Sequence, residues 1–263
     1  MKSVMRKVTP LPVRRAVRKA LNPGDLLRAE RIRRNFVSSF LGGGRELDRY
    51  TREVQESGLV EHLRAKGREF QVTVAELGEQ STLGAIEPRE GIYLYSILRK
   101  LQPRVAVETG VANGFSTAFS LLALQRNGSG ELYSIDLPRE VGREYEAGAF
   151  YQGKGSTGFP PGKEPGWLIP DELRERWTLV LGRSQEELPK LLERVGTIDS
   201  FMHDSEHSYE CMRFEYEIAW PSLRKGGALI SDDVNSTAAF REFAAEQSRK
   251  PVHIGPGLAF LVK

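Results

Sequence analysis

One stretch decides the fold of this chain: residues 105–124 have the sequence VAVETGVANGFSTAFSLLAL. The β-branched residues at its start predict a strand buried on both faces, and Phe115 and Phe119 then recur at helical spacing. Between strand and helix, Gly110 and Gly114 permit positive φ and a close approach of the backbone. The turn therefore aims the amides of a helix N-terminus at a ligand above the carboxyl edge of a sheet.

The sequence of the turn favours a cationic ligand over a pyrophosphate. Val111 and Ala112 follow Gly110 where the dinucleotide fingerprint GxGxxG has its second glycine. Glu108 would repel phosphates, whereas it suits a cation such as the amino group or the sulfonium of S-adenosylmethionine. A nicotinamide-dependent oxidoreductase on a similar fold stays open as an alternative, as does a turn that serves only as a tight connection.

Asp136 is a candidate ribose ligand. It ends the predicted strand 131–136, ELYSID, roughly 20 residues beyond the turn, where a ribose-binding carboxylate is expected. A solvated Asp capping a strand end is the alternative for Asp136 alone. Because Glu108 and Gly110 are in register with it, we favour the ribose interpretation.

Three acids follow two later strands. Residues 198–210, IDSFMHDSEHSYE, place Asp204 at a strand end, and residues 226–234, GGALISDDV, place Asp232 and Asp233 at another. Neighbouring parallel strands end at the same edge, so these carboxylates are expected to converge and to repel one another unless a hard divalent ion such as Mg²⁺ neutralises them. The alternative is that acids merely collect at strand ends.

The E-x-G-x-x-x-G turn and the acids resemble class I S-adenosylmethionine-dependent methyltransferases. From about residue 86 to its end, the chain is similar to cation-dependent O-methyltransferases related to catechol O-methyltransferase, and to cephamycin-type and macrolide-sugar O-methyltransferases of natural-product pathways. This resemblance implies an α/β fold, a Rossmann-like, doubly wound and mostly parallel sheet. It also implies S-adenosylmethionine as donor, Mg²⁺ or another divalent cation, and a small hydroxylated acceptor such as a phenol, a sugar or a natural product.

The resemblance also assigns residues. Asp204, Asp232 and Asp233 occupy the metal-ligand positions, and His207 falls where the catechol enzyme has its lysine base, so it is the predicted catalytic residue. Asp233 departs from the Asn common in that enzyme, and His207 departs from its lysine, so catechol itself is not implied. A structural role for His207 stays open. The predicted cofactor-binding residues are Glu108, Gly110, Ala112, Asn113, Ser116, Asp136, Gly182, Arg183, Ser184, Gln185 and Asp204.

Residues 177–185, WTLVLGRSQ, predict a further strand and a loop similar to the adenine-edge loop of catechol O-methyltransferase-like enzymes. Ser184 followed by acidic residues is also typical of a helix N-cap, and both roles can hold. His203 has a weaker claim to the site and is expected in the core or behind a ligand. A metal-independent methyltransferase is the nearest alternative function.

Composition agrees with an α/β enzyme. The 263 residues suffice for a full core, and Cys211, a predicted packing residue, is the only cysteine, which excludes a disulfide framework. No apolar run is long enough for a membrane span, and the start has no apolar signal-peptide segment, so a cytoplasmic location is expected.

The start of the chain is strongly basic, with eleven Lys and Arg residues in 1–34 against two acids. This pattern predicts a basic, amphipathic helical arm that packs on the core or on a partner subunit in a homo-oligomer. Nucleic-acid binding by this arm, as in a non-catalytic module, is the less favoured alternative.

The chain divides into an accessory region and a catalytic domain. Residues 1–85 are expected to be helical and irregular, with a break at 42–44, and residues 86–263 to form the methyltransferase domain. Its strands are expected near 104–108, 131–136, 177–181, 198–204 and 227–232, followed by a strand and turn region at the end. The glycine- and aromatic-rich insertion 138–170 is interpreted as a lid over the acceptor, with a surface linker as the alternative. Trp167 is a candidate wall of the site, and Trp167 and Trp177 could instead be core anchors.

Overall fold

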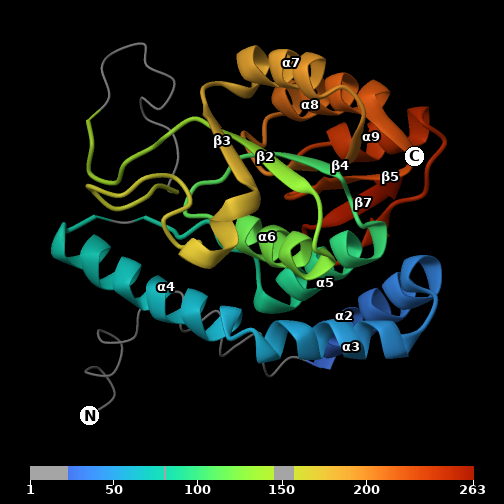
Figure 1. Ribbon diagram of the computed structural model, residues 1–263, viewed down its shortest axis with the longest axis horizontal. Helices are drawn as coiled ribbons and strands as arrows, with labels where there is room; N and C mark the ends of the chain where they lie inside the picture. Colours follow the sequence, from blue (N-terminus) through green and yellow to red (C-terminus); the bar gives the residue numbers. More distant parts are fainter. Residues whose placement is uncertain (1–22, 80, 145–156) are drawn as a thin grey trace.

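The computed structural model describes residues 23–79, 81–144 and 157–263. Within them, one sheet has the strand order β3-β2-β1-β4-β5-β7-β6 (Figure 1). Its strands are β1 Val105–Thr109, β2 Glu131–Asp136, β3 Trp177–Leu181, β4 Ile198–His203, β5 Leu223–Ser231, β6 Val252–His253 and β7 Ala259–Val262. Strands β1 to β5 are parallel, and β7 runs antiparallel to both β5 and β6. The mostly parallel sheet expected from the sequence is confirmed.

Helices cover both faces of this sheet (Figure 1). One face carries α5 Pro88–Leu101 and α6 Phe115–Asn127, and the other carries α7 Ser184–Val195, α8 Tyr209–Ser222 and α9 Ala239–Glu246. The sheet separates two hydrophobic clusters, one on each face, as a doubly wound fold requires. A 3₁₀ helix, η2 Asp171–Arg176, leads into β3.

The N-terminal extension is helical, as expected. It comprises α2 Pro23–Phe36, a π-helical turn η1 Val37–Leu41, α3 Gly44–Glu56 and α4 Leu59–Glu76, which form a layer outside α5 and α6 (Figure 1). Glu53 of α3 accepts hydrogen bonds from Tyr95 at 2.5 Å and from Arg99 at 2.8 Å, both on α5. The layer is therefore held against α5 by buried aromatic packing and by this carboxylate.

The first 22 residues of the basic arm lie outside the described residues, so its contact with a partner subunit stays a prediction. The break expected at 42–44 is present, because Gly42, with φ 87°, ends η1 and α3 begins at Gly44. Among the described helices, none is both long enough and apolar enough to cross a membrane.

Strand β5 begins four residues earlier than expected, at Leu223. Its polar residues Arg224 and Lys225 hide the strand in the sequence, yet Leu223 pairs with Ile198 across a register shift. Gly227 lies against this irregularity, where a Cβ would meet the carbonyl oxygen of Asp199 at 2.7 Å. The irregularity lets the strand start early and still present its far end, Ser231, beside His203.

The turn after β1 packs on the segment after β4. Gly110 has φ 84°, and a Cβ there would lie 1.9 Å from the carbonyl oxygen of Asp204. The amide of Asp204 in turn donates to the carbonyl oxygen of Thr109 at 2.9 Å. Only glycine fits position 110, and its close packing brings the predicted cofactor turn and the predicted metal ligand together.

Candidate functional site

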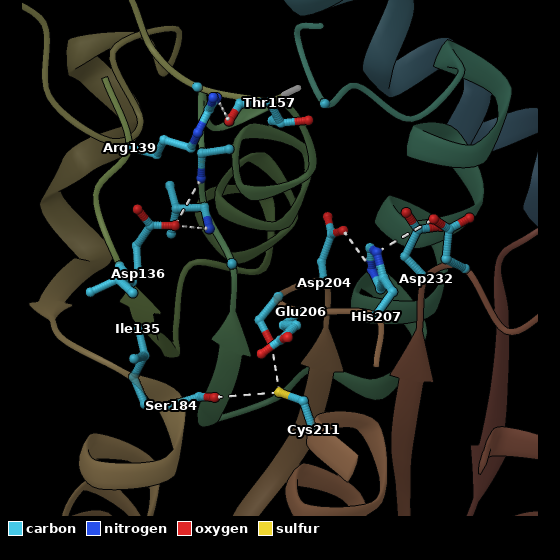
Figure 2. Close-up of a pocket in the computed structure, with 18 of the residues that line it drawn as sticks. Ile135, Asp136, Arg139, Thr157, Ser184, Asp204, Glu206, His207, Cys211 and Asp232 are labelled. Carbon is cyan, nitrogen blue, oxygen red and sulfur yellow. Dashed lines mark hydrogen bonds and ion pairs between the residues drawn. The ribbon is translucent and has the colours of Figure 1, made fainter. Parts of the chain in front are cut away.

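A cavity of about 950 Å³ opens above the carboxyl ends of the parallel strands (Figure 2). Its floor comes from the turn after β1, the ends of β2 and β3, and the loops after β4 and β5. These floor residues are Gly110, Val111, Ala112, Ile135, Asp136, Leu137, Gly182, Arg183, Ser184, Gln185, Asp204, Ser205, Glu206, His207, Cys211, Asp232 and Asp233. Residues 82–85, Arg139 and residues 157–159 form the opposite side. The sequence analysis predicted most of the floor; on the opposite side, Arg139 and residues 157–159 fall in the insertion interpreted as a lid, whereas residues 82–85 were not predicted.

Asp136 holds the turn in shape. Its Oδ1 accepts hydrogen bonds from the amides of Val111 at 2.8 Å and of Ala112 at 3.0 Å. Burial raises the pKa of this carboxyl group, and the two amide hydrogen bonds oppose the rise. Asp136 thus has one oxygen engaged by the turn, and Oδ2 has no described protein partner at the cavity wall.

Glu108 lies beneath the turn rather than on the cavity wall. Its side chain is buried, and its Oε1 accepts hydrogen bonds from Thr117 at 2.8 Å and Ser134 at 2.6 Å. Burial raises the pKa of Glu108 to about 7, and the two hydroxyl donors oppose this effect. The described cavity does not include Glu108, so its contact with a cationic cofactor group stays a prediction.

Two other predicted cofactor residues also lie behind the wall. Asn113 is buried and bonds to three protein groups, from Leu83, Gly158 and Trp167. The hydroxyl of Ser116 lies 3.5 Å from Oδ2 of Asp204. Neither residue lines the described cavity.

The segment after β3 and the start of α7 contribute all four of their predicted residues, Gly182, Arg183, Ser184 and Gln185, to the cavity. The N-cap interpretation of Ser184 is wrong, because Arg183 is the N-cap and Ser184 is the first residue of α7. Its hydroxyl turns toward Sγ of Cys211, 3.9 Å away (Figure 2), and the Gln185 amide lies 3.3 Å from the same sulfur. Burial raises the pKa of the Cys211 thiol to about 12, so this cysteine is an uncharged, cavity-lining residue.

The acids after β4 and β5 converge, as their strand order predicts. Ligand atoms of Asp204, His207 and Asp232 all lie within 4.8 Å of one another. Nε2 of His207 is 3.7 Å from Oδ1 of Asp204 (Figure 2), and its Nδ1 is 3.4 Å from Oδ2 of Asp233. Burial, and next the carboxylate of Asp232, raise the pKa of Asp204 well above its usual value.

This group of side chains fits a divalent cation. Burial and the neighbouring carboxylates disfavour the charged form of Asp204, and a bound positive ion would stabilise that form. Nε2 of His207 is buried and has no hydrogen-bond partner among the described residues. Asp233, at φ 47° and with its side chain 56% exposed, lies outside the tightest group, next to His207. Burial, and next His203, lower the pKa of His207, which favours its neutral form.

Glu215 of α8 is a buried carboxylate that the sequence analysis missed. It accepts hydrogen bonds from Thr109 at 2.5 Å and Ser205 at 2.6 Å, and its Oε2 lies 2.6 Å from Nδ1 of His203. Burial alone would raise the pKa of Glu215, but His203 and the hydroxyl donors lower it. The sequence feature that could have identified Glu215 is its charge on the same face of the helix as Cys211 and Met212. The core position expected for His203 agrees with its full burial.

The described part of the insertion contributes Arg139, Thr157, Gly158 and Phe159 to the cavity, whereas residues 145–156 lie outside the described residues. Trp167 is not among the lining residues, so it is not the wall that was expected. It packs against the core, and its ring lies 5.5 Å from Nζ of Lys66 of α4. Trp177 packs against the core too and donates to Ser134 at 2.7 Å.

Comparison with known proteins agrees with this arrangement. Residues 107–234 match a family model described as a methyltransferase domain, and no curated protein sequence matches the chain. A methyltransferase from Podospora anserina with bound S-adenosylhomocysteine (SAH) has a TM-score of 0.52 at 13% identity, over 78% of this chain and 87% of that one. An O-methyltransferase from Bacillus cereus in complex with SAH has a TM-score of 0.50 at 16% identity, over 79% of this chain and 91% of that one.

The two solved structures share the fold, and the family match covers β1 through the loop after β5. That segment contains the turn, Asp136 and the converging acids. Residues 107–234 are therefore a methyltransferase domain, and the chain has the fold of the class I S-adenosylmethionine-dependent methyltransferases. The resemblance found in the sequence is confirmed, and it is favoured over the nicotinamide-dependent alternative.

Proposed function

We propose that this enzyme transfers the methyl group of S-adenosylmethionine to a hydroxyl oxygen of a small molecule, with a divalent cation at the acidic edge. One observation carries the proposal: the turn after β1 and the acids after β4 and β5 line a single cavity. The backbone of Gly110 packs closely on that of Asp204, which supports a methyl donor and a methyl acceptor bound next to each other. Such alignment is what an in-line displacement needs.

The donor occupies the side of the cavity formed by β1, β2 and β3. Oδ2 of Asp136 accepts hydrogen bonds from the ribose hydroxyls. The amides of the turn and residues 182–185 border the rest of S-adenosylmethionine. The structural likeness to an O-methyltransferase from Bacillus cereus supports a hydroxyl acceptor. Phenols, sugars and natural products with adjacent hydroxyls all suit the acidic edge.

Asp204, Asp232 and Asp233 would hold the cation, and Mg²⁺ is the ion we propose. When bound, a divalent cation lowers the pKa of an acceptor hydroxyl. His207 takes the hydroxyl proton, for which a neutral imidazole is suited. The oxygen then bonds to the methyl carbon as the bond from carbon to sulfur breaks, which leaves S-adenosylhomocysteine.

Methyl transfer to a panel of acceptors tests this function. Purified enzyme is incubated with S-adenosylmethionine and phenols, catechols or sugars, with Mg²⁺ or with EDTA, and methylated products are identified by mass spectrometry. An O-methylated product that requires Mg²⁺ supports the proposal. Equal turnover in EDTA supports the metal-independent alternative, and methylation at nitrogen or carbon contradicts the proposal.

A further inference from the structure

Asn113 lies in the turn after β1, and both the nitrogen and the oxygen of its side-chain amide form hydrogen bonds with other protein groups. Its Nδ2 donates to the carbonyl oxygen of Leu83 at 2.9 Å and to that of Gly158 at 3.0 Å. Its Oδ1 accepts from Nε1 of Trp167 at 2.6 Å. The side chain is 1% exposed, so each of these bonds is made away from water.

Two of these partners belong to the side of the cavity that faces the turn. We call residues 82–85 and 157–159 the outer wall, because both segments line the cavity opposite the turn and a β-bridge joins Thr82 to Thr157. The hydroxyls of Thr82 and Thr157 lie 2.9 Å apart, and a Cβ on Gly84 would lie 2.5 Å from Cγ2 of Thr157. The two segments therefore form one unit, and Asn113 bonds to both of them.

Backbone bonds extend the same connection. The amide of Leu168 donates to the carbonyl oxygen of Asn113 at 3.1 Å, and that of Gly166 to the carbonyl oxygen of Ala112 at 2.9 Å. The turn thus holds both ends of the described segment 157–168. Ala112 is itself fixed by Asp136, so the wall, the turn and the predicted ribose ligand form one connected set.

Asparagine is the residue type that fits this position. Two donors and one acceptor must come from one planar group of this length, which the amide supplies. A carboxylate of the same size has no donor and would set its oxygens against two carbonyl oxygens. An alanine would leave both carbonyl groups and the indole N–H without their partners.

We propose that Asn113 is a positioning residue, which acts on donor and acceptor through the outer wall and does not touch the cofactor. Methyl transfer requires the reacting atoms to be aligned closely, and a loose wall would misalign them. The inference rests on the proposed function only for what the cavity binds. The state of the wall can be measured in the ligand-free protein.

The test compares Asn113→Ala and Trp167→Phe with a matched control, Asn127→Ala. Asn127 ends α6, the helix that follows the turn, and also donates its amide to a backbone carbonyl, that of Leu98, away from the cavity. Hydrogen exchange is followed in ligand-free protein over residues 82–86 and 157–168, and SAH binding is measured by calorimetry. Thermal melts and circular dichroism establish that each variant is folded.

We expect Asn113→Ala to speed exchange in both wall segments and to weaken SAH binding at least tenfold, with kcat for methyl transfer lowered as well. Trp167→Phe, which removes one of the three bonds, gives a smaller change in the same direction, and Asn127→Ala leaves the wall unchanged.

Weaker SAH binding with unchanged hydrogen exchange in the wall would overturn the proposal in favour of direct contact between Asn113 and the cofactor. Faster exchange with unchanged binding and kcat would leave only a structural role, and Trp167→Phe decides the matter if Asn113→Ala does not fold. Absence of SAH binding by the unaltered enzyme would instead contradict the proposed function.

Discussion

Nδ1 of His207 lies 3.4 Å from Oδ2 of Asp233, while the opposite nitrogen of the ring faces Asp204. A carboxylate beside Nδ1 favours the tautomer with its proton on that nitrogen, which leaves Nε2 able to accept a proton. The same geometry would also suit a metal ligand held by an outer carboxylate. The two roles differ in what the loss of the imidazole does to metal binding.

As a base, His207 is required for turnover and not for binding. His207→Ala is expected to lower kcat by roughly 10² to 10⁴ while Mg²⁺ and SAH affinities stay within a few-fold of those of the unaltered enzyme. Steady-state kinetics and calorimetry measure the two effects separately. Loss of metal binding in this variant would show that His207 is a ligand and would overturn its assignment as the base.

Without a bound cation, the neighbouring carboxylates of Asp204, Asp232 and Asp233 are expected to destabilise the folded protein. Asp232→Asn removes one of the charges that raise the pKa of Asp204, so the metal-free variant is expected to melt several degrees above the unaltered protein. It should also lose most of the stabilisation that Mg²⁺ confers. Thermal melts over a Mg²⁺ titration measure both effects, with the fully exposed Asp171→Asn as a control. A metal-free Asp232→Asn that melts lower would contradict the electrostatic account.

Glu108 predicts a pH dependence of stability. In the folded protein its pKa is about 7, against an ordinary value of 4.5, so the folded state holds the proton over a range where the unfolded state has released it. Its contribution is therefore complete below pH 4.5 and is lost as the pH rises through 7. Glu108→Gln keeps an oxygen for Thr117 and Ser134 but stays neutral.

Denaturation with urea at pH 5 and pH 8 tests this dependence. Relative to the unaltered protein, Glu108→Gln should gain up to roughly 3 kcal/mol of stability between the two pH values. Glu131→Gln, at a half-exposed position, is the control. Parallel profiles for Glu108→Gln and the unaltered protein would show that Glu108 ionises normally.

Glu215 joins the carboxyl ends of β1 and β4 to the loop that carries His207. Glu215→Gln replaces a charged acceptor that serves Thr109, His203 and Ser205, so we expect a loss of about 3 kcal/mol in the free energy of unfolding. The matched change on the same helix, Glu217→Gln, affects a 54% exposed carboxylate and should cost less than about 1 kcal/mol. Equal effects of the two changes would contradict this role for Glu215.

Local patterns predicted those parts of the site that depend on strand ends. Asp136, Asp204 and Asp232 each follow an apolar run, and parallel strands bring such positions to one edge whatever the loops do. The bonds of Asn113 to Leu83 and Gly158 depend on how distant segments pack, which residue spacing does not reveal. Glu215 was missed for the same reason, because its partners lie on other strands and loops.

The start of β5 shows a further limit. Arg224 and Lys225 are polar, and the pairing of Leu223 with Ile198 comes from the register of the sheet. Ser184 illustrates the reverse case: its local context fits an N-cap, but its hydroxyl turns toward Sγ of Cys211, and Arg183 occupies the N-cap position without a side-chain capping bond. Tertiary contacts decide between local options that the sequence alone leaves equal.

Calorimetric titration of SAH, with and without Mg²⁺, tests the central claim most directly. It compares the unaltered enzyme with Asp136→Asn, which keeps an oxygen for the amides of Val111 and Ala112, and with Asp204→Ala. The account predicts binding by the unaltered enzyme, a loss of at least tenfold in affinity for Asp136→Asn, and binding retained by Asp204→Ala. Binding that is indifferent to Asp136→Asn, or no binding by the unaltered enzyme, would contradict a donor site at the turn after β1.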